Sequence, residues 1–275
     1  MKFRRCLLAG LSLTLLWAGP VPAHAATGAT AASAVDCQEH QAFVDGDAHA
    51  VQARLPRSYI AVQDAATQHP LLFVRAIRCA HFAVAGDSWP VIFASYGIVV
   101  ESPDGMGCAS AAPVLGAAKG DVPPVCNWYT LAWFANDARA VRWLRAGTPS
   151  LPAHHVPTLE FELGALDPAR GGAPFRFRAP SPAPSTFTIE AVGRERPGKL
   201  PVRGGYWFDT PDGRIKLAFS TEDIESGDAN GAVTAAPGSE LATLLGAPRR
   251  TYAVGYSGVS AERWGHASYQ KQNFG

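Results

Sequence analysis

Short runs of β-branched and aromatic residues, separated by turn residues, fill most of the chain after residue 70 and limit its fold more than any other feature. The runs at 71–84, 91–101 and 128–135 have the composition of strands. Residues 158–163 and 174–178 alternate apolar and polar side chains with period two, as antiparallel strands with one buried face do. A chain of this pattern must pair its strands into a sheet that buries a core.

Three short helices interrupt the strands. They are expected over residues 47–54, 136–147 and 239–246. Asp47 and Ser239 are suitable N-caps, and Gly246 suits a helix C-terminus. Pro211-Asp212-Gly213 predicts a hairpin turn between strands at 206–208 and 214–219. We therefore expect an α+β domain, mainly antiparallel β, whose sheet is curled or closed into a barrel.

The first 25 residues have the pattern of a signal peptide. A basic start is followed by an apolar run from Cys6 to Ala18 and by a small-x-small cleavage site at Ala23-His24-Ala25. The run is short for a bilayer span, although an uncleaved N-terminal anchor remains an alternative, and no later segment is long and apolar enough. We expect an exported protein, periplasmic or secreted, with a flexible lead-in over 26–36 and a single domain over 37–275.

Charge excludes one class of partner. The chain carries 24 basic and 23 acidic residues. Removal of the three basic residues of the leader leaves 21 basic against 23 acidic, a net charge of −2. No basic stripe remains to neutralise phosphates, so nucleic-acid binding is not expected. The sequence does not indicate an oligomeric state.

The cysteines favour disulfides over a metal site. The chain has five, and Cys6 leaves with the leader. Four cysteines in an exported chain most simply form two disulfides, for which three pairings exist. We favour Cys108–Cys126, which closes a Gly/Ala/Pro-rich loop, and Cys37–Cys79, which ties the N-terminal segment to a strand. No Cys-x-x-Cys or Cys/His cluster supports a metal, so neither a metal nor another cofactor is expected.

Three segments between residues 51 and 151 carry a family resemblance. They are Val51-Gln52-Ala53-Arg54-Leu55-Pro56, the two strands around Val74 and Ser95, and the helix and turn AVRWLRAGTP over 140–149. Together they resemble the acetoacetate decarboxylase superfamily. The resemblance implies a cone-shaped β-barrel with an apolar interior cavity that accepts a small molecule.

The same resemblance implies that the family's Schiff-base chemistry is absent from this chain. Its members use a lysine amine, acidified beside a second lysine, to form a Schiff base with a β-keto acid. Ser150 and Leu151 stand at those positions here, and a serine hydroxyl cannot form an imine. The other lysines of the mature chain are expected in loops or exposed strand positions: Lys119, Lys199, Lys216 and Lys271.

Further polar positions of the family are also replaced. Trp143 and Leu144 correspond to its helix arginine and glutamate, and its strand glutamate falls near Ser95 or Tyr96. A barrel without the lysine keeps an apolar cavity with a few polar groups, the general description of a small-molecule site. We expect the ligand-binding side chains to be Arg75, Ser95, Trp133, Arg142 and His155, with Arg75 as the carboxylate anchor. Alternatively, Arg75 and Arg78 both lie on the solvent face of their strand.

Three functions remain open. The first is a binder of a small apolar or carboxylate-bearing molecule, without Schiff-base decarboxylation. The second is a lyase or hydrolase in which Ser150 and His154 are catalytic, with Asp137, Glu160 or Glu162 as the orienting carboxylate. Because neighbouring residues of a strand point to opposite faces, only one of His154 and His155 can reach a cavity. The third is a secreted interaction protein with a filled core.

Overall fold

The computed structural model of the chain describes residues 24–25, 31–103, 127–146, 151–165, 172–180, 185–193, 199–211, 213–252 and 254–270. The strands are β1 (His24–Ala25), β2 (Ala32–Asp45), β3 (Leu71–Val84), β4 (Asp87–Val99), β5 (Asn127–Ala135), β6 (Ala153–His155), β7 (Glu160–Leu163), β8 (Ala173–Ala179), β9 (Phe187–Gly193), β10 (Lys199–Thr210), β11 (Gly213–Ala235), β12 (Arg249–Tyr252) and β13 (Val254–Gln270). The helices are α1 (Ala48–Arg54), α3 (Ala138–Ala146) and α4 (Glu240–Leu245).

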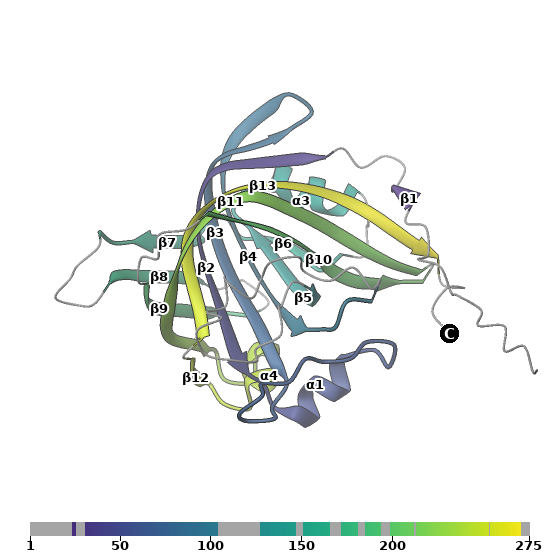
Figure 1. The fold of residues 1–275 in the computed structure, drawn as a ribbon, viewed down its shortest axis with the longest axis vertical. Helices are drawn as coiled ribbons and strands as arrows, with labels where there is room; N and C mark the ends of the chain where they lie inside the picture. The colour runs from purple at the N-terminus through teal and green to yellow at the C-terminus, as the bar shows by residue number, and fades with distance from the viewer. Residues whose placement is uncertain are drawn as a thin grey trace, which may run out of the picture.

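Strands β2, β3, β4, β5, β10, β11 and β13 pair in that order, and β13 returns to β2, so the ring of pairings closes (Figure 1). Every pairing in this ring is antiparallel except that of β5 with β10. The expected α+β fold, mainly antiparallel and closed into a barrel, is confirmed.

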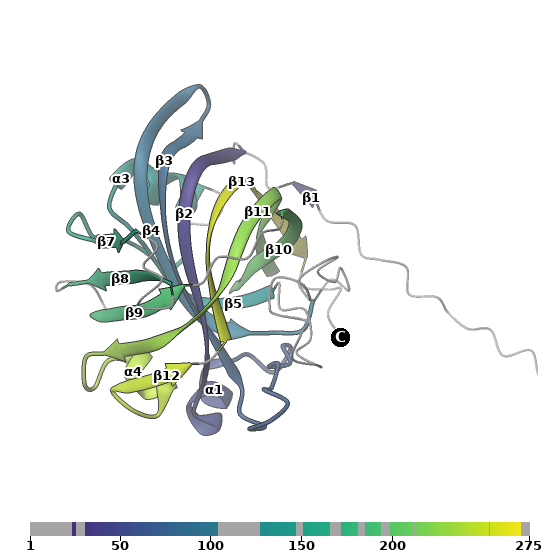
Figure 2. The same cartoon turned by 60° about the vertical axis from the view of Figure 1, so that its left-hand side comes forward.

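A second layer of strands is continuous with the barrel through β11. The 23 residues of β11 are long enough to pair with strands of both layers. Its C-terminal part pairs with β9 and with β12, and β8 and β7 follow β9 (Figure 2). The β7–β9 strands therefore lie against the outside of the barrel rather than in its wall.

Two hydrophobic cores result from this arrangement. One lines the barrel interior and includes Phe73, Phe93 and Trp133. The other lies between the outer face of the barrel and the second layer, and includes Val74 and Phe177. Because the first half of β3 is buried on both faces, it reads as an apolar run interrupted by Arg75 and not as an alternation.

The expected helices are confirmed where the structure describes them. The Asp47 side chain accepts a hydrogen bond from the backbone N–H of Ala50 at 2.8 Å and caps α1. Ser239 accepts from Ala242 N at 3.2 Å and caps α4, which ends at Gly246 in the left-handed conformation. The C-terminal turn expected at residue 147 lies outside the described residues.

Two boundaries were wrong. β2 begins at Ala32, so residues 32–36 of the expected lead-in belong to the sheet. The hairpin strands expected around Pro211 are longer than predicted and belong to β10 and β11. These stretches are polar or glycine-rich, and their pairing around the closed ring outweighs their weak strand propensity.

Cys37 and Cys79 stand directly opposite each other on β2 and β3 and form a disulfide, as expected. Cys108 and Cys126 lie outside the described residues, so their pairing stays a prediction. No helix in the described part of the chain is long and apolar enough to cross a bilayer.

Candidate functional site

Three of the predicted ligand-binding residues stand in one row across the barrel wall. Arg75 on β3 faces Ser95 on β4, which faces Trp133 on β5. Directly opposite residues share a face of the sheet, and Trp133 belongs to the interior core. The row therefore points into the barrel. The alternative that Arg75 lies on the solvent face is wrong, because Arg75 is only 1% exposed.

A buried network surrounds the Arg75 guanidinium. Its Nε donates to Glu39 Oε2 at 2.9 Å, and its Nη2 donates to the same oxygen. Its Nη1 donates to the hydroxyl oxygen of Tyr206 on β10. Strands β4 and β5 separate β3 from β10 in the ring, so this last bond crosses the barrel interior. Gln41 completes the group with a long contact of 3.5 Å from its Nε2 to Glu39.

Glu39, Gln41 and Tyr206 were not among the predicted site residues. Cys37, Glu39, Gln41 and Phe43 occupy alternate positions of β2, all buried. These positions share one face of the strand, but two of the four are polar, so the sequence shows no apolar alternation that would have marked the face as buried.

Other polar groups on the interior face make no hydrogen bond to the residues that the structure describes. The hydroxyls of Ser95 and Thr130 and the indole N–H of Trp128 are buried and make no hydrogen bond within the described part of the chain. Thr130 faces Gly97, two residues along β4 from Ser95. Buried hydroxyls are nearly always hydrogen-bonded to protein, water or ligand, so these groups are candidates for hydrogen bonds to a ligand or a water molecule.

Aromatic rings enclose this polar patch. The ring of Tyr206 lies 4.9 Å from that of Trp128 and 4.8 Å from that of Trp133, between centroids. Phe73 stacks on Trp128 at 4.4 Å, and Phe219 of β11 lies 5.4 Å from it. Any molecule reaching the Ser95 hydroxyl from within the barrel would contact aromatic surface.

Beside these rings, the interior contacts α3. Trp143 packs edge-on against Phe82 at 5.4 Å, and Leu144 is fully buried in the interior core. Leu151, at the second lysine position of the family resemblance, is buried in the same core. Where the resemblance would place charged groups, this chain places apolar side chains.

His154 does not join the row. It pairs with Phe134 on β5 and so faces the outside of the barrel, opposite to Ser95. Its ring lies 5.7 Å from the Phe134 ring. Burial lowers the pKa of His154 below its ordinary value, and the nearby positive charge of Arg145 lowers it further.

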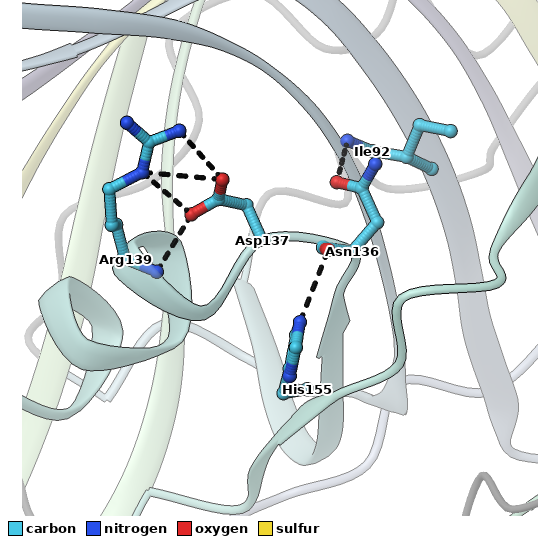
Figure 3. Close-up of polar contacts among 5 residues, drawn as sticks. All are labelled: Ile92, Asn136, Asp137, Arg139 and His155. Carbon is cyan, nitrogen blue, oxygen red and sulfur yellow. Dashed lines mark hydrogen bonds and ion pairs between the residues drawn. The ribbon is translucent and has the colours of Figure 1, made fainter.

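His155 is exposed and engaged locally (Figure 3). Its Nε2 lies 3.2 Å from the carbonyl oxygen of Asn136, whose side-chain oxygen accepts from Ile92 N at 2.8 Å. Asp137 is held by Arg139 at the start of α3, and the Arg139 guanidinium keeps the pKa of that carboxyl below its ordinary value. Asp137 therefore has its partner in Arg139, and no described contact links it to either histidine.

Two more predicted residues lie apart from the row. Arg142 is exposed on α3. Ser150 lies outside the described residues, and its catalytic role stays a prediction, as does that of His154. Among the side chains that the structure describes, no group of His, Cys, Asp and Glu is placed to hold a metal ion.

The expectation that Lys216 is exposed is wrong. Lys216 is 5% exposed and lies on the outer face of β11, opposite Trp207. Its Nζ is 5.1 Å from the centre of the Trp207 ring. The absence of a side chain at Gly205 makes room for it, because a Cβ there would lie 2.4 Å from the lysine Cε.

An open groove of about 520 Å³ lies outside the barrel, between β3 and the β7–β8 hairpin. It is lined by Arg78, Phe161, Glu162, Leu163, Gly164, Pro174, Phe175 and Arg176. None of the predicted ligand-binding residues lines it. The interior row is the better candidate because its polar groups are buried and converge.

Solved structures share this architecture. The acetoacetate decarboxylase of Legionella pneumophila is similar with a TM-score of 0.51 and 14% identity, over 98% of this chain and 100% of that one. A second acetoacetate decarboxylase structure matches with a TM-score of 0.51 and 11% identity, over 94% and 95% of the two chains. The enduracididine biosynthesis enzyme MppR, complexed with the condensation product of pyruvate and imidazole 4-carboxaldehyde, matches with a TM-score of 0.50 and 10% identity, over 86% and 88%.

No protein-family model and no curated protein sequence matches the chain. The likeness therefore lies in the arrangement of the strands over almost the whole length of both chains. The chain has the fold of the acetoacetate decarboxylase-like superfamily.

Proposed function

We propose that this barrel binds a small molecule in its interior. The polar end of the ligand lies at the Arg75–Ser95 row, and its apolar body lies against Trp128 and Trp133. The proposal includes no Schiff-base chemistry, because the two positions that resemble the family's lysines are Ser150 and Leu151.

The observation that carries the proposal is the buried Ser95 hydroxyl. It stands directly opposite Arg75 and makes no hydrogen bond within the described residues. A core filled only by side chains would place an apolar residue here, since an unsatisfied buried hydroxyl costs about 1–3 kcal/mol. A ligand oxygen, or water in its absence, satisfies the group.

The structural neighbours support a small-molecule role. MppR, which shares the fold, is complexed with a condensation product of pyruvate. That product belongs to MppR, and this chain differs at the positions that resemble the reactive lysines. What transfers is the use of this fold to hold a small organic molecule.

The proposal places the protein in an oxidising compartment outside the cytoplasm. Support comes from the signal-like leader and from the Cys37–Cys79 disulfide, since such bonds persist mainly in exported proteins. N-terminal sequencing of the protein recovered from its host tests the leader, and a first residue near 26 is expected. An intact N-terminus on protein from the cytoplasm would contradict this part of the proposal.

Interior binding can be tested with 5-fluorotryptophan-labelled protein. The probe is 4-phenylbutan-2-one, and each ¹⁹F resonance is assigned by a single Trp→Phe substitution. We expect saturable shifts at Trp128 and Trp133 and none at Trp207, which lies on the outer face of β10. Ser95→Ala should weaken the probe about fivefold, the loss of one hydrogen bond.

The control is Ser88→Ala, an exposed position near the end of the β3–β4 hairpin, which should leave the affinity unchanged. Shifts confined to Trp207, or no shift at any tryptophan, would contradict interior binding. If the probe binds in the interior, mass spectrometry of the protein as purified from its host can identify the natural ligand.

A further inference from the structure

Charge inside the barrel limits what the site can accept. Among the buried side chains that the structure describes on the interior face, Arg75 and Glu39 are the charged ones, and they are bound to each other. Both are 1% exposed. The guanidinium therefore meets a ligand while it is paired with a carboxylate.

A ligand carboxylate would disturb this balance. To reach the guanidinium it must displace Glu39, which would break a buried ion pair. If it binds beside the pair instead, two negative groups share a site of low dielectric, and like charges placed together oppose binding. Either route disfavours an anionic ligand.

A neutral oxygen meets no such opposition. The Ser95 and Thr130 hydroxyls can each donate to a carbonyl or accept from an alcohol. The apolar remainder of the ligand is received by the rings of Trp128 and Trp133.

Building on the interior site of the proposed function, we propose that Glu39 is its specificity-determining residue. By neutralising Arg75 it excludes free carboxylates and selects neutral ketones, aldehydes or alcohols with an apolar body. This replaces the expectation from the sequence that Arg75 binds a ligand carboxylate directly.

The test compares two probes of similar size, the ketone 4-phenylbutan-2-one and the anion 3-phenylpropanoate. Their affinities are measured at pH 7 by titration calorimetry on the full mature chain. The wild-type protein should bind the ketone at least about tenfold more tightly than the carboxylate. In Glu39→Gln the carboxylate should gain at least about tenfold, while the ketone changes by less than about threefold.

Glu101→Gln is the matched control, because Glu101 is exposed beyond the end of β4, and it should change neither affinity. Equal binding of both probes by the wild-type protein would overturn the role of Glu39 while leaving interior binding intact, and so would an unchanged ratio in Glu39→Gln. Failure of both probes to bind either protein would overturn interior binding and this inference with it. The wild-type ratio decides the question even if the variant does not fold.

Discussion

Arg75 of β3 donates a hydrogen bond to the hydroxyl oxygen of Tyr206 on β10, a strand that is not its neighbour in the barrel wall. The same guanidinium is paired with Glu39 of the adjacent strand β2. One side chain thus links opposite sides of the interior. The stability of the barrel should therefore depend on this link.

Arg75→Ala should destabilise the fold strongly. The substitution breaks the buried ion pair between Arg75 and Glu39, and breaking a buried pair by removing one partner costs about 3–5 kcal/mol. Urea unfolding at pH 7 measures the change in free energy. The double variant Arg75→Met, Glu39→Gln removes both charges and should lose much less. If the single and double variants are equally stable, the buried pair has no such role.

Tyr206→Phe should cost about 1–3 kcal/mol in the free energy of unfolding, because the Arg75 Nη1 donor loses its acceptor in a buried site. Tyr129→Phe serves as the comparison, since Tyr129 pairs with Ile98 and lies half-buried on the outer face of β5. Both variants are assayed by urea unfolding with circular dichroism. Equal losses for the two variants would remove the cross-barrel bond from the explanation.

His40 should make stability depend on pH. It is fully buried, stacks on Phe175 at 4.5 Å and lies 2.6 Å from the Tyr252 hydroxyl. Burial lowers the pKa of His40 to about 3 from its ordinary 6.5. As pH falls below about 6.5, the unfolded chain takes up a proton that the folded chain refuses, so stability is lost between about pH 6.5 and 3.

The contribution of His40 to the slope is at most about 1.4 kcal/mol per pH unit, the value for one proton. His40→Gln keeps a polar partner for Tyr252 without a titrating ring, and its slope should be smaller by that amount. Urea unfolding at pH 7 and 4.5 measures both slopes. Identical slopes in the two proteins would show that His40 is not the group responsible.

The disulfide between Cys37 and Cys79 should contribute about 2–4 kcal/mol to stability, a typical value for a native bridge, and the cysteines are 42 residues apart. Cys37→Ala with Cys79→Ala measures it by thermal unfolding. Non-reducing peptide mapping should recover the two cysteines in one linked pair. Thiol titration of the denatured mature chain should find no free cysteine, and two or more free thiols would contradict the prediction of two bridges.

Incubation with acetoacetate and sodium borohydride should give no covalent adduct. Imine formation requires a lysine amine, and the positions that resemble the family's lysines are Ser150 and Leu151. Intact-mass spectrometry provides the measurement. Lys216→Arg is the informative control, because Lys216 is buried over Trp207. An adduct on the wild-type protein that disappears in this variant would identify Lys216 as a reactive amine.

Local pattern was sufficient for much of the fold. β3, α1 and α4 were predicted with nearly correct bounds, because strand runs and cap residues are read within a few positions of the chain. The Cys37–Cys79 pairing was predicted from the expectation of export and from the choice among three pairings. The superfamily fold followed from the segments between residues 51 and 151.

The tertiary structure decided which side chains meet. The resemblance left the family's glutamate position at Ser95 or Tyr96, and strand pairing places Ser95 inside the barrel and Tyr96 in the outer core. A strand turns alternate residues to opposite faces, so one step of register changes the whole site.

Glu39, Arg75 and Tyr206 come together across separations of 36 and 131 residues. No local pattern predicts such contacts. The sequence by itself determined which segments become strands and helices. Closure of the ring determined the buried network, because only a closed sheet brings β2, β3 and β10 to face the same interior.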